Sequence, residues 1–198
     1  WVTGYSGGGI STVTGSLTTP LKVDVSETGE GVTFAAWVYP MATSGYHNPV
    51  SGTSYHAWSI TQSSFGSSSG WGFGDGSKSI RTATIATIDY NQWQHIAMVF
   101  DPVSSEGKLY KNGQFIAEIA PLYFKSTLES IVLGKGFGGI IDEVRVYARA
   151  LDYNEVAALV PHNQPPVVNA GSNITLASTA STAALHGNVV DDGLTASV

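Results

Sequence analysis

The sequence of 198 residues contains no cysteine. This absence excludes a disulfide framework and leaves both a cytosolic and an exported setting open, because a domain of this size needs no disulfide to fold. Charged residues make up only 12% of the chain, with 9 basic and 15 acidic side chains and a net charge of −6. The basic residues form no cluster, so we expect neither nucleic acid nor an anionic membrane surface as a partner.

Long apolar runs are also missing. The longest uncharged stretch, residues 41–73 with their neighbours, is rich in Ser, Gly and His, so we expect no membrane insertion. The chain starts at Trp1 without an initiator Met and shows no signal peptide. This start predicts an internal piece of a longer protein, covalently linked to neighbouring domains.

Glycine, with 23 residues, and aromatic side chains, at 11%, are plentiful. This composition is typical of a β-protein with many turns. The clearest local signal is the pair Asn112-Gly113, which lies between two alternating runs at 108–111 and 114–117. Asn-Gly supplies the positive φ angles of a two-residue type I′ turn, so the pair predicts a β-hairpin.

A family pattern surrounds this hairpin. It reads TFAAWVYP at 33–40, WQHIAMVFD at 93–101, LYKNG at 109–113 and GIIDEVRVYARALDYNE at 139–155. The pattern resembles the laminin-G-like, concanavalin A-like lectin/glucanase domain in the form found in large secreted bacterial proteins. The resemblance covers roughly residues 30–160. It implies an all-β fold, an antiparallel two-sheet jelly-roll sandwich with one short C-terminal helix.

The alternation of apolar and polar residues predicts the individual elements. We expect a linker at 1–20 with an edge strand at 12–17, and then a domain at 21–160. Its strands are expected at 21–25, 32–39, 58–61, 70–74, 79–86, 95–101, 108–111, 114–120, 130–133 and 140–148. Residues 32–39 are apolar on both faces, which predicts a central strand. A helix is expected at 152–159, with Asp152 as its cap and Glu155 three residues on.

The composition changes after the expected helix. Residues 161–166 form a Pro-rich linker, and the following VVNAG, LHG and DDG motifs at 167–193 resemble the start of a polycystic-kidney-disease-type immunoglobulin-like module. Such a sandwich takes about 80–100 residues, so residues 167–198 would be a truncated module.

No catalytic pattern stands out. The E-x-D-x-x-E run of sandwich glycosidases is missing, and the adjacent Asp142 and Glu143 would point to opposite faces of a strand. A lyase site assembled from Tyr55, His56 and Arg81 remains an alternative.

A structural Ca²⁺ is what the resemblance implies for Asp142, with Asp24 or Glu27 supplying further oxygens. The alternative is that Asp142 accepts backbone amides or pairs with an arginine. The five histidines show no zinc spacing, and we interpret His95 as a satisfied structural histidine.

Aromatic side chains are the candidates for ligand binding, because sugar rings stack on flat aromatic faces. Trp37, Trp71 and Trp93 lie in predicted strands, so we assign them to the core. The ligand-binding candidates in the Ser/Gly-rich segment are Tyr46, Tyr55, His56, Trp58 and Phe65. The alternative is that these residues only close the sandwich.

The sequence therefore predicts a non-catalytic binding module of a larger secreted or surface bacterial protein, with a carbohydrate as its ligand. One alternative is an adhesion or spacer domain that makes protein–protein contacts, and another is a polysaccharide lyase or hydrolase on the same fold. Exposed aromatics beside polar side chains on a concave sheet face would favour the sugar, whereas a smooth face of Ser and Thr would favour the spacer.

Overall fold

The fold is taken from a computed structural model of the chain. It describes residues 1–23, 29–41, 46–53, 58–63, 70–75, 80–82, 86–119, 129–161, 167–173, 175, 179, 182, 184 and 186–190. The chain divides into two compact units, Trp1–Val160 and Pro161–Val198.

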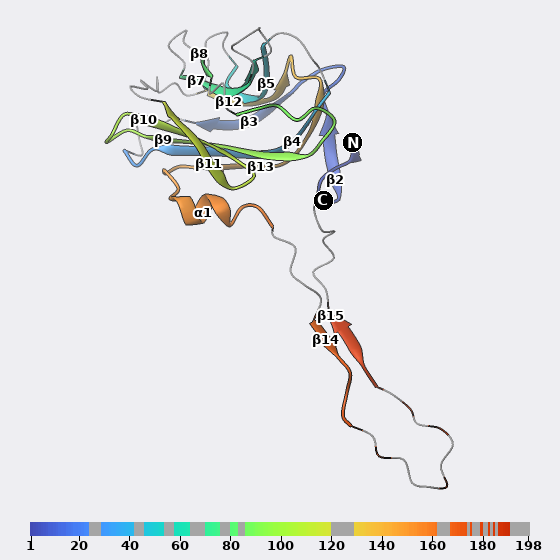
Figure 1. The fold of residues 1–198 in the computed structure, drawn as a ribbon. Coiled ribbons are helices and arrows are strands. Elements are labelled where there is room, and N and C mark those ends of the chain that lie inside the picture. Colours follow the sequence, from blue (N-terminus) through green and yellow to red (C-terminus); the bar gives the residue numbers. More distant parts are fainter. Residues whose placement is uncertain are drawn as a thin grey trace. The chain divides into compact units, whose positions relative to one another are not determined.

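The first unit is built on two antiparallel sheets (Figure 1). The seven-stranded sheet has the order β1 (Val2–Thr3), β2 (Gly8–Ser11), β13 (Gly139–Tyr147), β4 (Val32–Pro40), β9 (Gln94–Asp101), β10 (Glu106–Lys111) and β11 (Gln114–Ile119). The six-stranded sheet has the order β3 (Leu17–Val23), β12 (Glu129–Lys135), β5 (Tyr46–Ser51), β6 (Trp58–Ser63), β7 (Gly70–Asp75) and β8 (Ile80–Thr82). The predicted two-sheet jelly-roll sandwich is therefore confirmed.

The core lies between the two sheets. From β4 it receives Phe34, Ala36 and Val38, which pack in one cluster with Ile60 of β6 and Trp71 of β7. Because successive residues of a strand point to opposite faces, the residues between them face away from the core. Strand β4 lies between β13 and β9 and is buried almost throughout, so its prediction as a central strand is confirmed.

A short helix, α1 (Tyr153–Ala157), covers part of the outer face of the seven-stranded sheet (Figure 1). Its Val156 packs in a second cluster with Ala35 and Ala97. Asp152 Oδ1 accepts the N–H of Glu155 at 2.9 Å, and Glu155 Oε2 accepts the N–H of Asp152 at 2.9 Å. The predicted capping box is confirmed, although the helix is shorter than expected.

The hairpin at Asn112-Gly113 joins β10 to β11 as predicted. Asn112 has φ 50° and Gly113 has φ 76°, the left-handed values that a type I′ turn requires.

The N-terminus differs from the prediction. Residues 1–11 do not form a linker, because β1 pairs with β2 and β2 pairs with β13 through Ile10 opposite Ile141. The edge strand thus lies earlier than the predicted 12–17, and the next strand, β3, begins at Leu17. Strand β5, within the segment expected to be irregular, was also missed.

The second unit contains one antiparallel pair among its described residues, β14 (Val167–Asn169) with β15 (Asn188–Val190). Their Val168 and Val189 are 69% and 63% exposed, so neither side chain is part of a core. Within the described chain, no helix has the length and apolarity needed to cross a membrane.

Candidate functional site

The predicted ligand-binding residues are not brought together where the structure describes them. Tyr46 starts β5 opposite Ser63, the last residue of β6, whereas Trp58 starts β6 opposite Asp75. Tyr46 and Trp58 thus lie at opposite ends of β6, about 17 Å apart at 3.3 Å per residue. Tyr55, His56 and Phe65 lie outside the described residues, as does the lyase alternative that depends on the first two.

The outer face of the six-stranded sheet carries small hydroxyl side chains. Ser51, Ser59 and Thr61 are 1%, 4% and 0% exposed and alternate with core residues of β5 and β6. Thr61 Oγ1 donates to Asn48 Oδ1 at 2.9 Å and lies 2.9 Å from Ser59 Oγ. This hydrogen-bonded row crosses two strands and contains no charged group.

Glycines continue this face on the neighbouring strand. Gly70, Gly72 and Gly74 of β7 lie opposite Ser63, Thr61 and Ser59 of β6, and they alternate with the core residue Trp71. Glycine inside a strand leaves bare backbone and often marks a place where another group approaches closely. The outer face of β5, β6 and β7 is therefore lined by hydroxyl groups and backbone, and these residues are buried.

The outer face of the seven-stranded sheet carries aromatic rings instead. Trp37 of β4 points away from the core, and Tyr5 stacks on it with ring centroids 3.5 Å apart and planes 8° apart. Trp93 meets Tyr5 edge-on at 6.0 Å and Tyr39 edge-on at 5.5 Å. We call Tyr5, Trp37, Tyr39 and Trp93 the outer aromatic group.

The side chains of the outer aromatic group differ in their exposure to solvent. Trp37 is only 7% exposed, yet its ring is covered by Tyr5 and not by the opposite sheet. Trp93 is half-buried in the connection before β9, so its assignment to the core is wrong. Tyr5 and Tyr39 are half-buried as well. The core assignment is confirmed for Trp71, which is fully buried and donates to Gln94 Oε1 at 2.9 Å. It is also confirmed for the buried Trp37, whose ring nevertheless lies outside the cluster between the sheets.

Asp142 holds the N-terminal turn on this face. Asp142 lies opposite Trp37 in the sheet, and its Oδ2 accepts the N–H of Ser6 at 2.9 Å. A Cβ added to Gly4 would overlap the same oxygen, so only glycine fits there. The run Gly4-Tyr5-Ser6-Gly7-Gly8 spells G-x-S-x-G, but it lies between two strands without a following helix, which is not the context of a nucleophile elbow.

Both carboxylate oxygens of Asp142, the proposed calcium ligand, accept hydrogen bonds from backbone N–H groups. The second oxygen of Asp142, Oδ1, accepts the N–H of Glu143 at 2.8 Å, which is one of the alternatives that the sequence left open. Among the described residues no group of three His, Cys, Asp or Glu side chains could hold a metal ion. Asp24 and Glu27 lie outside the described residues, so the calcium site remains a prediction.

His95 lies beside Trp37 on the same face, with ring centroids 5.5 Å apart. It is 2% exposed, as expected for a structural histidine, but its Nδ1 has no hydrogen-bond partner among the described residues. Burial, and secondarily the positive charge of Arg145, lower the pKa of His95 to about 4. The histidine is therefore structural in position but not satisfied.

An ion pair borders the aromatic group on β13. Arg145 Nη2 lies 2.9 Å from Glu143 Oε2, and both side chains are partly exposed. The pair exists because β13 bulges between Asp142 and Arg145, where Glu143 has a left-handed φ of 47°. Hydrogen bonding to Glu143 raises the pKa of Arg145 above its usual value, so the guanidinium stays charged.

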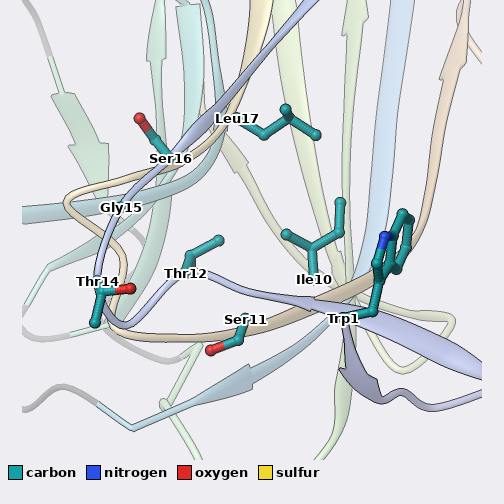
Figure 2. A pocket seen from close by; sticks show the side chains of 8 residues that line it. All are labelled: Trp1, Ile10, Ser11, Thr12, Thr14, Gly15, Ser16 and Leu17. Carbon is teal, nitrogen blue, oxygen red and sulfur yellow. The ribbon is translucent and has the colours of Figure 1, made fainter.

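A separate hollow of about 370 Å³ lies beside β2 and the edge strand β3. In Figure 2, Trp1, Ile10 and Leu17 lie on one side of the view, whereas the hydroxyls of Ser11 and Ser16 point to the other. Trp1 is 93% exposed, so packing does not fix its ring for recognition. The hollow is a weaker candidate than the outer aromatic group.

The family is shown by the sequence itself. The family model of the concanavalin A-like lectin/glucanases superfamily matches residues 11–157. The chain belongs to this superfamily. No curated protein matches the sequence.

Solved structures share the fold at low sequence identity. Domain 4 of AbnA, an extracellular arabinanase from Geobacillus stearothermophilus in complex with arabinotriose, is 21% identical over 80% of this chain and 79% of that chain, with a TM-score of 0.61. A pentraxin from Limulus polyphemus is 15% identical over 74% and 75%, with a TM-score of 0.57. The IT-sialidase CBM40 of Ruminococcus gnavus, bound to α2,3-sialyllactose, is 18% identical over 77% and 96%, with a TM-score of 0.54.

Proposed function

We propose that residues 1–160 form a non-catalytic carbohydrate-binding module of a larger secreted or surface protein. The observation that carries this proposal is the outer aromatic group. Two half-buried rings, Tyr39 and Trp93, lie beside the stacked Tyr5 and Trp37 on a sheet face outside the core. The partly exposed pair of Arg145 and Glu143 lies on the neighbouring strand β13, where Arg145 pairs with Ala35 of β4.

This combination suits a sugar. The C–H face of a pyranose stacks on an aromatic ring, while charged and amide side chains bond its hydroxyl groups and fix its orientation. Arg145 donates hydrogen bonds and Glu143 accepts them, so the pair can serve a diol without adding net charge. Tyr39 of β4 and Trp93 of the connection before β9 contact each other with ring centroids 5.5 Å apart, so these two rings are preorganised.

The similar structures support the proposal without deciding it. Two of them are described in complex with arabinotriose and with sialyllactose, and both are domains of larger enzymes. By analogy, this module would serve a longer chain outside the cell, and we propose that residues 167–198 are the truncated start of an immunoglobulin-like neighbour.

A spacer or adhesion role is the second candidate. The Ser, Thr and Gly row of the six-stranded sheet favours it, because this row contains no aromatic ring, although its side chains are buried. The two candidates differ in whether the protein binds any glycan.

A glycan array followed by calorimetry tests the proposal. We expect binding of the wild-type protein, with Trp93→Ala weakening it about tenfold, the equivalent of one lost stacking contact. Phe115→Ala is the matched control, because Phe115 is an aromatic residue of the same sheet that is 48% exposed and lies outside the group. Absence of binding to every glycan, or an equal loss in both variants, would contradict the proposal.

Calcium is proposed only as a structural ion at Asp142. Running the array and a thermal melt with and without EDTA tests it, since a bound ion stabilises the folded state by mass action. A melting temperature that EDTA leaves unchanged would exclude the structural ion and leave the sugar proposal standing.

A further inference from the structure

The N-terminal tip, residues 4–7, occupies the place where a ligand ring would stack. Tyr5 lies parallel to Trp37, with 3.5 Å between ring centroids and 8° between ring planes. Tyr5 also contacts Trp93, with 6.0 Å between ring centroids and 69° between ring planes. Tyr5 therefore covers Trp37 next to a second tryptophan, and a pyranose ring is close to a phenol ring in size.

A buried polar atom beside Trp37 lacks a partner. His95 lies edge-on to Trp37, is 2% exposed, and its Nδ1 makes no hydrogen bond among the described residues. Buried polar atoms are normally paired, so one without a partner calls for an explanation. A hydroxyl-bearing ring stacked on Trp37 would bring hydrogen-bonding groups next to the imidazole, whereas the face of the Tyr5 ring brings none.

The tip is held by few interactions. Ser6 N–H donates to Asp142 Oδ2 at 2.9 Å, and Gly4 N–H donates to Gly7 O at 3.0 Å. Strand β1, which precedes the tip, has two residues, lies at the edge of the sheet, and pairs with β2 through Val2 and Thr3 only. A segment with so few ties belongs to the part of a fold that opens locally at low cost.

We propose that the N-terminal tip is a lid, and that its opening exchanges Tyr5 for a neutral hexopyranose residue stacked on Trp37. This inference rests on the proposed carbohydrate function. It specifies where the sugar stacks, on Trp37, and what regulates its access, the opening of the tip. The closed form competes with the sugar, so the apparent affinity is reduced by the fraction of molecules in the open form.

Two variants open the lid in different ways. Tyr5→Ala removes the competing ring. Gly4→Ala keeps the ring but places a Cβ against Asp142 Oδ2 and against the backbone of Gly8 and Gly9, which displaces the tip from β2 and β13. Gly15→Ala is the matched glycine control, because a Cβ there meets open space, and Phe115→Ala is the matched aromatic control.

The experiment measures calorimetric binding of neutral oligosaccharides of glucose, galactose and mannose, together with hydrogen exchange of the Trp37 indole N–H by NMR. With about one molecule in ten open in the wild type, we expect both lid variants to bind about tenfold more tightly, and the controls to match the wild type. Exchange at Trp37 should be faster in both lid variants.

The outcomes distinguish a failure of the lid proposal from a failure of the carbohydrate-binding proposal. Weaker or unchanged sugar binding in both lid variants, with the wild type binding, would overturn the lid, because Tyr5 would then be a contact or a structural ring. Unchanged Trp37 exchange in Gly4→Ala would overturn it independently of any sugar. No binding by any protein, with faster Trp37 exchange, would overturn the carbohydrate function and the exchange of Tyr5 for a sugar together.

Discussion

Acidification should destabilise the protein through His95. Its imidazole is 2% exposed, its Nδ1 has no partner among the described residues, and its pKa is lowered from 6.5 to about 4. The folded state thus binds the proton less well than the unfolded chain. The stability is therefore full above pH 6.5 and is lost as the pH falls towards 4.

The size of the effect follows from the pKa difference. A shift of about 2.5 units corresponds to about 3 kcal/mol, and by linkage about 2 kcal/mol of it is lost by pH 5. Desolvation is the main cause of the low pKa, and the charge of Arg145 on the neighbouring strand β13 adds to it. Arg145→Gln should therefore raise the pKa of His95 and reduce the loss without abolishing it.

Urea unfolding between pH 7 and pH 4 measures this loss. We compare the wild type with His95→Phe, which keeps an aromatic ring against Trp37 but cannot take up a proton. The wild type should lose about 3 kcal/mol more than the variant over this range. Parallel curves for the two proteins would refute the reasoning, because the acid sensitivity would then come from other groups.

Three further substitutions test the packing. Asp152→Ala should lower the free energy of unfolding by about 1 kcal/mol in urea, whereas Asn154→Ala in the same helix should change it by less than about 0.5 kcal/mol; equal losses would contradict the capping box. Gly134→Ala should cost more than about 1 kcal/mol, since Gly134 has φ 79° and a Cβ would overlap Thr12; an unchanged melting temperature would exclude this strain. Gln94→Leu should lower the free energy of unfolding by about 1–3 kcal/mol, measured by thermal unfolding, because it leaves the buried indole N–H of Trp71 without its acceptor. Wild-type stability in this variant would show that another group accepts the indole N–H.

The sandwich could be predicted because its signals are local and repeated. The alternation in residues 32–39, the Asn112-Gly113 turn and the Asp152 cap each specify one element through backbone chemistry. The first strands could not be predicted in the same way, because Gly, Ser and Thr at residues 1–11 resemble a linker until β13 offers a partner. Their pairing is a long-range property that no local pattern carries.

The candidate site was missed for a related reason. Trp37 and Trp93 lie in stretches that read as strands, so the sequence places them in the core, yet a strand residue can face either side of a sheet. The packing of Phe34, Ala36 and Val38 between the sheets shows that the Trp37 ring points outward. One signal was available: Tyr5 stands among glycines, and a lone aromatic in such a run needs a partner elsewhere.

The two halves of the outer face of the seven-stranded sheet are covered in different ways. Helix α1 covers Ala35 and Ala97 with a capped turn and the buried side chain of Val156. Trp37 is covered by one tyrosine on a tip whose nearest strand has two residues. A segment that covered the sheet for stability alone would be expected to resemble helix α1, since buried apolar area and helix caps stabilise such a segment. The lighter cover lies over the larger aromatic surface and next to the His95 imidazole, whose Nδ1 has no partner among the described residues. An exchangeable contact at this place can serve binding.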